Sequence, residues 1–255
     1  MTGKRSDVVC VVALPGDQDI RYGEYCLKTW KWWCERNGVL LHVLDTPLPG
    51  GERLRPNWQR YLVFEALARE KIAYDQVAVV DLDTMVRWDC PNFFRLTRRR
   101  FTAVPDLGNF GWIHHSLNAY QALFPGIHVE RDEYFNAGFV VVNAQHRRLY
   151  DAMIEFYDST HAPRLSAEAA VRGPRHFTDQ TPLNYLVRKR RQALTLLPIR
   201  FNFISMASRQ CLVDSSFIEL AYIWHFTGFQ RELRHEFMRT TWNAVRPMYG
   251  AQPRS

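Results

Sequence analysis

The chain has 255 residues, a formal net charge of +7 and a hydrophobic content of 47%, which suits one large domain or one domain with a subdomain. The basic balance allows an anionic partner, but no nucleic-acid-binding signature accompanies the arginine runs, so we expect no nucleic acid. No segment approaches the roughly 18 apolar residues of a membrane span. The five cysteines are odd in number and form no CxxC pair, which favours free thiols in a reducing, cytoplasmic compartment.

The first half of the chain predicts alternating strands and helices. Apolar runs predict strands at Val8–Leu14, Val39–Leu44 and Val77–Val80. Helical spacing predicts helices at Gly23–Asn37 and Asn57–Glu70, with a Pro- and Gly-rich loop before the second. This order predicts a parallel, doubly wound sheet. The absence of GxGxxG and Walker motifs disfavours a dinucleotide-binding fold and a P-loop NTPase.

The second half predicts shorter elements. The Gly- and aromatic-rich segment Leu107–Ile127 predicts a long irregular lid or binding loop, and Leu165–Arg175 predicts an exposed connector. Thr181 and Pro182 are typical of the N-cap and first position of a helix. Further strands are expected at 101–104, 134–143, 194–203 and 221–228, and helices at 148–157 and 230–249.

Two carboxylates follow the strand predicted at Val77–Val80. In an extended chain Asp81 and Asp83 project to the same side, at the strand end where ligands bind in open α/β sheets. A pair of carboxylates there suits a hard divalent cation that bridges to phosphate. On this segment alone, a solvated strand end with two chance acids is an equally good interpretation.

Four motifs then occur in one order: Asp81-Leu82-Asp83, Phe135-Asn136-Ala137-Gly138, Asp179-Gln180 with Leu183-Asn184, and His225-Phe226-Thr227-Gly228. Together they resemble the GT-A class of nucleotide-sugar glycosyltransferases, nearest to the glycogenin and lipopolysaccharide galactosyltransferase type of family 8. The resemblance spans Val8–Gly228. It implies an α/β, GT-A (Rossmann-like) fold with a mixed, mainly parallel sheet flanked by helices, in a domain at 1–229 with a basic, aromatic tail at 230–255.

The resemblance implies a metal site for Mn²⁺ or Mg²⁺. Asp81, Asp83 and His225 would be its protein ligands, and an imidazole among carboxylates favours Mn²⁺ by ligand softness. Without its partners, a histidine on a hydrophobic run such as His225 is more typical of a core residue.

The resemblance also implies the substrate contacts. Asp179 and Gln180 are expected at the anomeric carbon as the catalytic residues. Asn136, Ala137 and Gly138 would line the transferred sugar. Ala13 would contact the base, Asp81 the ribose and Arg60 the diphosphate. Asp106 would hydrogen-bond a hydroxyl of the donor or the acceptor.

Two departures from the family pattern bear on the donor. Family members carry Lys-Pro-Trp after His-x-x-Gly, whereas here Phe229-Gln230-Arg231 follows Gly228, so the grip on the diphosphate passes to Arg231 or is absent. The usual Asp-x-Asn-Tyr nucleotide loop is replaced by Leu14-Pro15-Gly16-Asp17. A UDP-sugar is the expected donor, and a GDP-sugar stays open.

The sequence therefore predicts hexose transfer from a nucleotide-sugar to a saccharide or other hydroxyl acceptor. By analogy the transfer retains configuration, whereas an inverting mechanism would ask Asp179 or another carboxylate to deprotonate the acceptor. One alternative is a haloacid-dehalogenase-like phosphatase, against which Met85 stands where that family has Thr or Val. A second is a catalytically silent nucleotide-sugar-binding scaffold. The tail is expected to pack on the domain, with peripheral membrane contact as the alternative.

Overall fold

The computed structural model describes residues 6–13, 23–163, 178–204, 206 and 216–250. Three predictions fall outside these residues: the loop Leu14-Pro15-Gly16-Asp17, the connector Leu165–Arg175 and the state of Cys211. The other four cysteines, Cys10, Cys26, Cys34 and Cys90, are buried free thiols.

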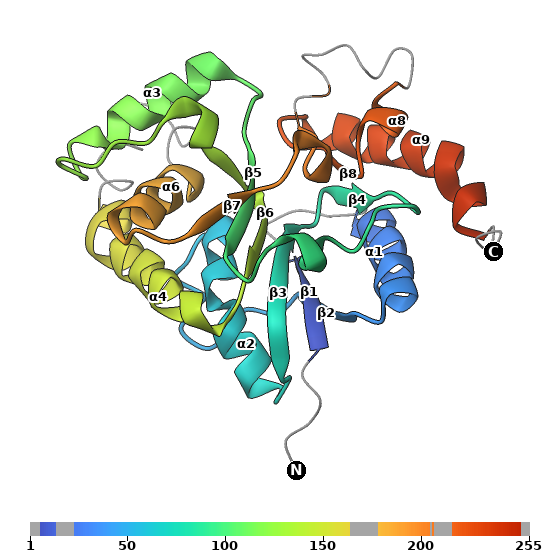
Figure 1. The fold of residues 1–255 in the computed structure, drawn as a ribbon, viewed down its shortest axis with the longest axis horizontal. Helices are drawn as coiled ribbons and strands as arrows, with labels where there is room; N and C mark the ends of the chain where they lie inside the picture. The colour runs from blue at the N-terminus through green and yellow to red at the C-terminus, as the bar shows by residue number, and fades with distance from the viewer. Residues whose placement is uncertain (1–5, 14–22, 164–177, 205, 207–215, 251–255) are drawn as a thin grey trace.

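Six strands form one mixed sheet in the order β2-β1-β3-β6-β5-β7 (Figure 1). Strands β1 (Ser6–Val12), β2 (Leu40–Leu44) and β3 (Tyr74–Asp81) are parallel. Strand β6 (Phe135–Val142) runs antiparallel to β3 and β5 (Phe101–Pro105), and β5 is parallel to β7 (Leu194–Leu196). The mainly parallel sheet is confirmed, and β6 supplies the reversal that a doubly wound parallel order lacks.

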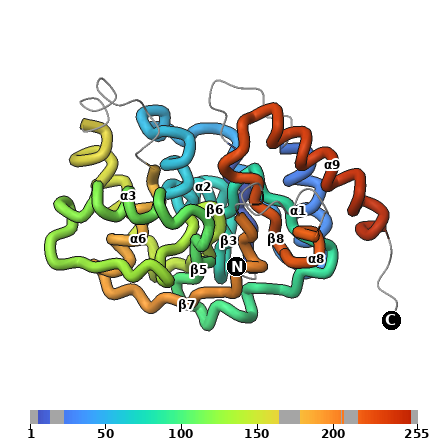
Figure 2. The backbone as a smooth tube through the Cα atoms, turned by 90° about the horizontal axis from the view of Figure 1, so that it is seen from above, coloured from blue at the N-terminus to red at the C-terminus, as the bar shows by residue number. Residues whose placement is uncertain are grey.

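Helices cover both faces of the sheet (Figures 1 and 2). On one face lie α2 (Val63–Arg69), α3 (Phe110–Gln121), α4 (Arg147–Phe156) and α6 (Gln180–Lys189). On the other lie α1 (Gly23–Asn37), α8 (Phe217–Leu220) and α9 (Arg231–Gly250). Because both faces are covered, the central strands are apolar at nearly every position, and all of β6 is buried.

The segment Leu107–Ile127 is helical, which corrects the prediction of an irregular loop. Asn109 caps α3 by accepting a hydrogen bond from the Trp112 amide at 2.9 Å. Ile113, Ser116 and Tyr120 form its buried stripe. The aromatic residues and histidines of this segment obscured the helical spacing of those three positions.

Three other boundaries differ from the sequence prediction. The helix expected at Asn57–Glu70 is a 3₁₀ helix, η1 (Pro56–Leu62), followed by α2. Thr181 is inside α6, where its hydroxyl contacts Tyr134 at 2.8 Å instead of capping the helix. The strand expected at Leu194–Phe203 ends before Pro198, which leads into the 3₁₀ helix η7 (Ile199–Phe201). The shorter turns are η2 (Phe93–Leu96), η3 (Arg131–Glu133), η4 (Ala144–His146) and the π-helical η5 (Tyr157–His161).

A separate two-stranded sheet positions the site. Strand β3 ends at Asp81, and Leu82 and Asp83 form the turn into β4 (Thr84–Val86). Strand β4 pairs antiparallel with β8 (Ile223–His225), so that Thr84 lies opposite His225. Asp83 is therefore held by a turn and not by strand alternation, and this pairing brings the C-terminal histidine beside it.

The C-terminal tail is the helix α9, as predicted, and it packs on the domain. Its buried residues are Met238, Thr241, Val245 and Tyr249. Trp32 of α1 donates a hydrogen bond to the Tyr249 carbonyl at 2.6 Å. Within the described part of the chain, no helix is both long and apolar enough to cross a membrane.

Candidate metal centre and adjoining cavity

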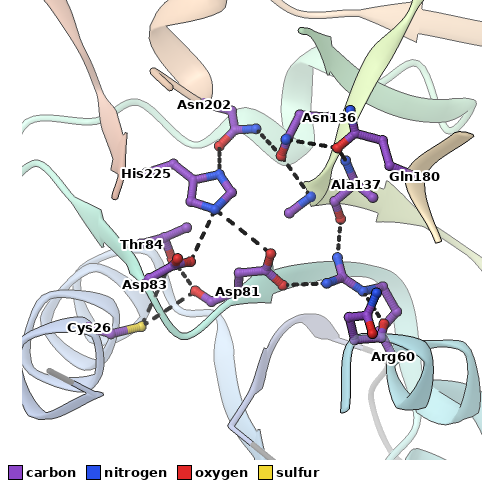
Figure 3. Close-up of polar contacts among 12 residues, drawn as sticks. Cys26, Arg60, Asp81, Asp83, Thr84, Asn136, Ala137, Gln180, Asn202 and His225 are labelled. Carbon is purple, nitrogen blue, oxygen red and sulfur yellow. Dashed lines mark hydrogen bonds and ion pairs between the residues drawn. The ribbon is translucent and has the colours of Figure 1, made fainter. Parts of the chain in front are cut away.

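Asp81, Asp83 and His225 each offer a ligand atom, and these three atoms lie within 4.8 Å of one another (Figure 3). The Nε2 atom of His225 is 3.1 Å from Asp83 Oδ1 and 3.8 Å from Asp81 Oδ2. The chain thus brings together two carboxylates from the middle of the sequence and an imidazole from near its end, as the motif order predicts.

Backbone and hydroxyl contacts fix the turn that carries the two aspartates. Thr84 Oγ1 donates to the Asp81 carbonyl at 2.6 Å and accepts from Trp30 Nε1 at 2.9 Å. The Phe226 amide, next to His225, donates to the Asp83 carbonyl at 2.9 Å. Trp30 of α1 is therefore a core residue that supports the turn carrying the two aspartates.

Asp81 is paired with a buried arginine. Arg60 Nη2 lies 2.7 Å from Asp81 Oδ1, and Arg60 Nε lies 3.2 Å from Asp179 Oδ2. Arg60 Nη1 also donates to the Ala137 carbonyl. Burial raises the pKa of Asp81, and the Arg60 charge opposes that rise without cancelling it.

Asp83 has a different set of partners. Its Oδ1 faces His225, and its Oδ2 lies 3.3 Å from Nη1 of Arg234 on α9. Burial acts to raise the pKa of Asp83, but the nearby His225 and Arg234 outweigh it and lower the pKa to about 2. Burial acts to lower the pKa of His225, and the charges of Asp83 and Asp81 outweigh it and raise the pKa.

The donor set fits a divalent cation. The Nε2 atom of His225 is buried. Among the described residues it makes no well-aligned hydrogen bond, although both carboxylates are close to it. Its other nitrogen, Nδ1, is 2.9 Å from Asn202 Oδ1. A neutral imidazole whose second nitrogen is hydrogen-bonded, beside two carboxylates, is a common arrangement for Mn²⁺ and related ions.

Gly138 leaves the space in which these groups meet. A Cβ atom on Gly138 would lie 2.2 Å from His225 Cε1 and 2.7 Å from Asp81 Oδ2. Both neighbours are held by partners, His225 by Asn202 and Asp81 by Arg60, and cannot move aside cheaply. Glycine is required here for close approach, since Gly138 borders Asp81 and His225.

A cavity of about 580 Å³ adjoins the cluster on the side of Asn136. Its polar lining includes Asp106, Asn136 and Gln180, and Gly228 lines it where the chain leaves β8. Apolar side chains lie among these polar groups: Phe110, Trp112 and Ile204. Polar groups interspersed with apolar surface suit a small polyhydroxylated ligand.

The predicted site residues are distributed unevenly around this cavity. Gln180 lines it, whereas the adjacent Asp179 is only 4% exposed, and its oxygens are engaged by Asn57, Tyr61 and Arg60. Ala13 is buried at the end of β1, where its amide donates to the Leu44 carbonyl.

Arg231, the residue predicted to grip a diphosphate, is the first residue of α9. One turn further along the helix, Arg234 Nη1 lies 3.3 Å from Asp83 Oδ2 of the cluster. Sequence reasoning missed Arg234 and assigned no role to Asn202. Helical spacing of three residues from Arg231 is the signal that could have suggested Arg234.

No protein-family profile matches the chain, and no curated protein matches its sequence. Solved structures do match. A glycosyltransferase involved in the glycosylation of the major capsid of PBCV-1 has a TM-score of 0.59 and 11% identity, over 92% of this chain and 99% of that chain. The bifunctional glycosyltransferase WbbM has a TM-score of 0.55 and 15% identity, over 95% of this chain and 51% of its own.

The galactosyltransferase LgtC, in complex with donor and acceptor sugar analogs, matches with a lower TM-score of 0.47 and 16% identity, over 94% of this chain and 99% of that chain. At the identities of the two better matches, structural similarity speaks for the fold and not for the reaction. The fold that the motif order predicts is confirmed, and the chain has the GT-A fold of glycosyltransferases.

Proposed function

We propose that this protein is a metal-dependent glycosyltransferase that moves a hexose from a nucleotide-sugar, a UDP-sugar in the first instance, to a hydroxyl of a saccharide acceptor. The observation that carries the proposal is the meeting of Asp81, Asp83 and His225 beside the cavity. Asp83 and His225 are more than 140 residues apart in the sequence, and the pairing of β4 with β8 brings them together.

Asp81, Asp83 and His225 would hold Mn²⁺ or Mg²⁺. When bound, such an ion would stabilise the negative charge that builds on the leaving diphosphate. Two arginines flank the same place, Arg60 beside Asp81 and Arg234 beside Asp83. We assign the diphosphate contact of α9 to Arg234, which lies by the cluster, in place of the Arg231 that the sequence pattern indicated. A guanidinium offers the forked donors that a phosphate accepts.

Gln180, Asn136 and Asp106 would hold the transferred sugar, because their side chains line the cavity and bond one another. Asp179 would hold Arg60 in place and would not contact the sugar itself, because its oxygens already accept hydrogen bonds from Asn57 and Tyr61. This arrangement supports retention. An inverting reaction needs a carboxylate free to take the acceptor proton, whereas Asp179 and the cavity-lining Asp106 are at most 6% exposed and already accept hydrogen bonds on both oxygens.

The acceptor would enter over α3. Trp112 lines the cavity, and Phe110, which is 48% exposed, lines it as well. Aromatic rings at the mouth of a polar cavity offer apolar surface to the C–H face of a sugar ring. This surface favours a saccharide acceptor over a simple alcohol.

The test is a panel of UDP-Gal, UDP-Glc, UDP-GlcNAc and GDP-Man, assayed for hydrolysis and transfer with Mn²⁺ and with EDTA. We expect one donor to be turned over with Mn²⁺ and none with EDTA. Asp83→Ala should remove the activity, because it deletes a ligand and leaves His225 and Arg234 without their carboxylate. The proposal of an enzyme would be refuted if no donor were turned over and no donor gave a thermal shift.

The same preparation separates the two alternatives. A phosphatase of the Asp-x-Asp type would cleave simple phosphate esters and lose that activity in Asp81→Asn, because it uses the first aspartate as nucleophile. A silent scaffold would bind one donor with Mn²⁺, seen as a thermal shift, and turn over none. Each outcome excludes the transferase in a distinct way.

A further inference from the structure

A chain of buried amide side chains connects the cavity to His225 (Figure 3). Gln180 Nε2 donates to Asp106 Oδ2 at 2.8 Å, and Gln180 Oε1 accepts from Asn136 Nδ2 at 3.0 Å. Asn136 Oδ1 accepts from Asn202 Nδ2 at 3.0 Å, and Asn202 Oδ1 lies 2.9 Å from His225 Nδ1. All five residues are at most 7% exposed. We call Gln180, Asn136 and Asn202 the amide relay.

Backbone amides fix the direction of the relay. The Gly138 amide can only donate, and it lies 2.8 Å from Asn136 Oδ1, so that atom is the oxygen. Asn202 must then present its NH₂ group to Asn136, which leaves its oxygen facing His225. The Ala137 amide fixes Gln180 in the same way, by donating to Gln180 Oε1 at 3.3 Å.

The direction of the relay decides which nitrogen of His225 carries hydrogen. Asn202 Oδ1 accepts, so Nδ1 of His225 must be the donor. The lone pair of the neutral ring is then on Nε2, which lies between Asp81 and Asp83. If Asn202 were turned over, its NH₂ group would meet Nδ1, and the hydrogen would move to the nitrogen that faces the carboxylates.

We propose that Asn202 is a positioning residue that holds His225 in the tautomer needed to bind a divalent cation, with its own orientation fixed by the Gly138 amide through Asn136. The inference rests on the metal centre of the proposed function. It adds a role for a side chain that is not among the residues lining the cavity. It also links the two halves of the site, since Asn136 and Gln180 line the cavity while Asn202 contacts the metal-facing ring.

The test compares Asn202→Leu with Asn202→Asp. Leucine removes the acceptor, whereas aspartate keeps an oxygen opposite Nδ1. Mn²⁺ affinity, measured by calorimetry, should fall about 10- to 100-fold in Asn202→Leu, the usual cost of losing the group behind a histidine ligand. In Asn202→Asp we expect a smaller loss of Mn²⁺ affinity than in Asn202→Leu, because an oxygen behind the ring keeps the same tautomer, although the second carboxylate oxygen faces Asn136 Oδ1.

The second readout is the tautomer itself. Proteins with ¹⁵N-labelled histidine are compared by NMR at alkaline pH, above the point at which the His225 signals stop titrating, with those signals assigned from their absence in His225→Gln. We expect hydrogen on Nδ1 in the wild type and in Asn202→Asp, and a shift toward Nε2 in Asn202→Leu. This measurement needs no metal.

The matched control is Gln76→Leu, which likewise removes a buried amide side chain. Gln76 is near the start of β3, at the end away from Asp81, and contacts Thr97 and Phe94. This variant should lose stability without losing Mn²⁺ affinity. The proposal would be overturned by an unchanged tautomer and unchanged Mn²⁺ affinity in folded Asn202→Leu. It would also be overturned if Asn202→Asp lost as much Mn²⁺ affinity as Asn202→Leu. A wild type that binds no Mn²⁺ would instead refute the proposed function, while the tautomer measurement would still stand.

Discussion

Asp81 and Asp83 are two residues apart, yet the fold gives them different surroundings. Asp81 ends a central strand and is paired with Arg60, whose side chain is 5% exposed and also contacts Asp179. Asp83 is in a turn and is paired with His225 and with Arg234, whose side chain is 22% exposed. The pKa of Asp81 is raised and that of Asp83 is lowered.

The difference indicates a division of labour. In the first group Arg60 and Asp179 are buried and belong to the framework of the domain, although the Asp81 side chain is 25% exposed. The Asp83–His225–Arg234 group includes a side chain from α9 that reaches water and can exchange one anionic partner for another. We therefore expect the loss of Arg60 to act mainly on stability and the loss of Arg234 to act mainly on ligand binding, whereas both aspartates belong to the candidate metal centre.

The largest effect is expected from Arg60→Met. It leaves the buried Asp179 with an uncompensated charge and the partly exposed Asp81 without its cation, which costs about 3–5 kcal/mol in the free energy of unfolding. Urea denaturation of the metal-free protein measures it. The control is Arg53→Met, which breaks an exposed ion pair with Asp158 and should cost less than about 1 kcal/mol. Equal losses in the two variants would remove the distinction between framework and surface.

Gly138→Ala should break both groups at once, because the new methyl group collides with His225 and with Asp81. We expect a loss of about 1–3 kcal/mol from overpacking, together with loss of measurable Mn²⁺ binding by calorimetry. Gly111→Ala on α3 is the control, since its Cβ would meet no atom closer than 3.5 Å. Wild-type Mn²⁺ affinity in Gly138→Ala would contradict the cramped geometry that we describe.

Asp83→Asn should lower the stability of the metal-free protein in a pH-dependent way. The pKa of Asp83 is lowered from 3.8 to about 2. The stability that its carboxylate contributes is therefore complete above about pH 4 and is lost as the pH falls toward 2. The pKa of His225 is raised from 6.5, so its contribution is complete below that value and is lost as the pH rises through the raised pKa.

The deficit of Asp83→Asn should therefore be largest between about pH 4 and 6.5, on the order of 2 kcal/mol. Denaturation at about pH 5.5 and about pH 9 measures the difference. The same deficit at both values would show that the ion pair with His225 contributes nothing to the metal-free fold.

The smallest effect on stability is expected from Arg234→Met, at less than about 1 kcal/mol, because the side chain of Arg234 is partly hydrated. Its effect should appear in donor binding, as a raised KM with Mn²⁺ present, since a cation beside the diphosphate is lost. Arg231→Met serves as the control and should leave KM near the wild-type value. The reverse result would return the diphosphate contact to Arg231.

Much of the framework could be predicted from local patterns. The valine-rich runs predicted β1 and β3, and helical spacing predicted α1. Where local signals competed, prediction failed. The aromatic residues of Leu107–Ile127 suggested a loop, whereas burial of Ile113, Ser116 and Tyr120 makes that segment a helix. Pro198 likewise stops β7 early because it cannot donate to a strand ladder.

For the candidate site, the sequence by itself determined which ligand types are present and in what order, because the spacing of Asp81, Asp83 and His225 is a property of the chain. Only the tertiary structure decided their partners. The pairing of β4 with β8 brings His225 to Asp83, α9 brings Arg234 to Asp83, and backbone amides orient the relay that ends at Asn202. These contacts join residues far apart in the chain, and no local spacing encodes the distance or the direction of a hydrogen bond between them.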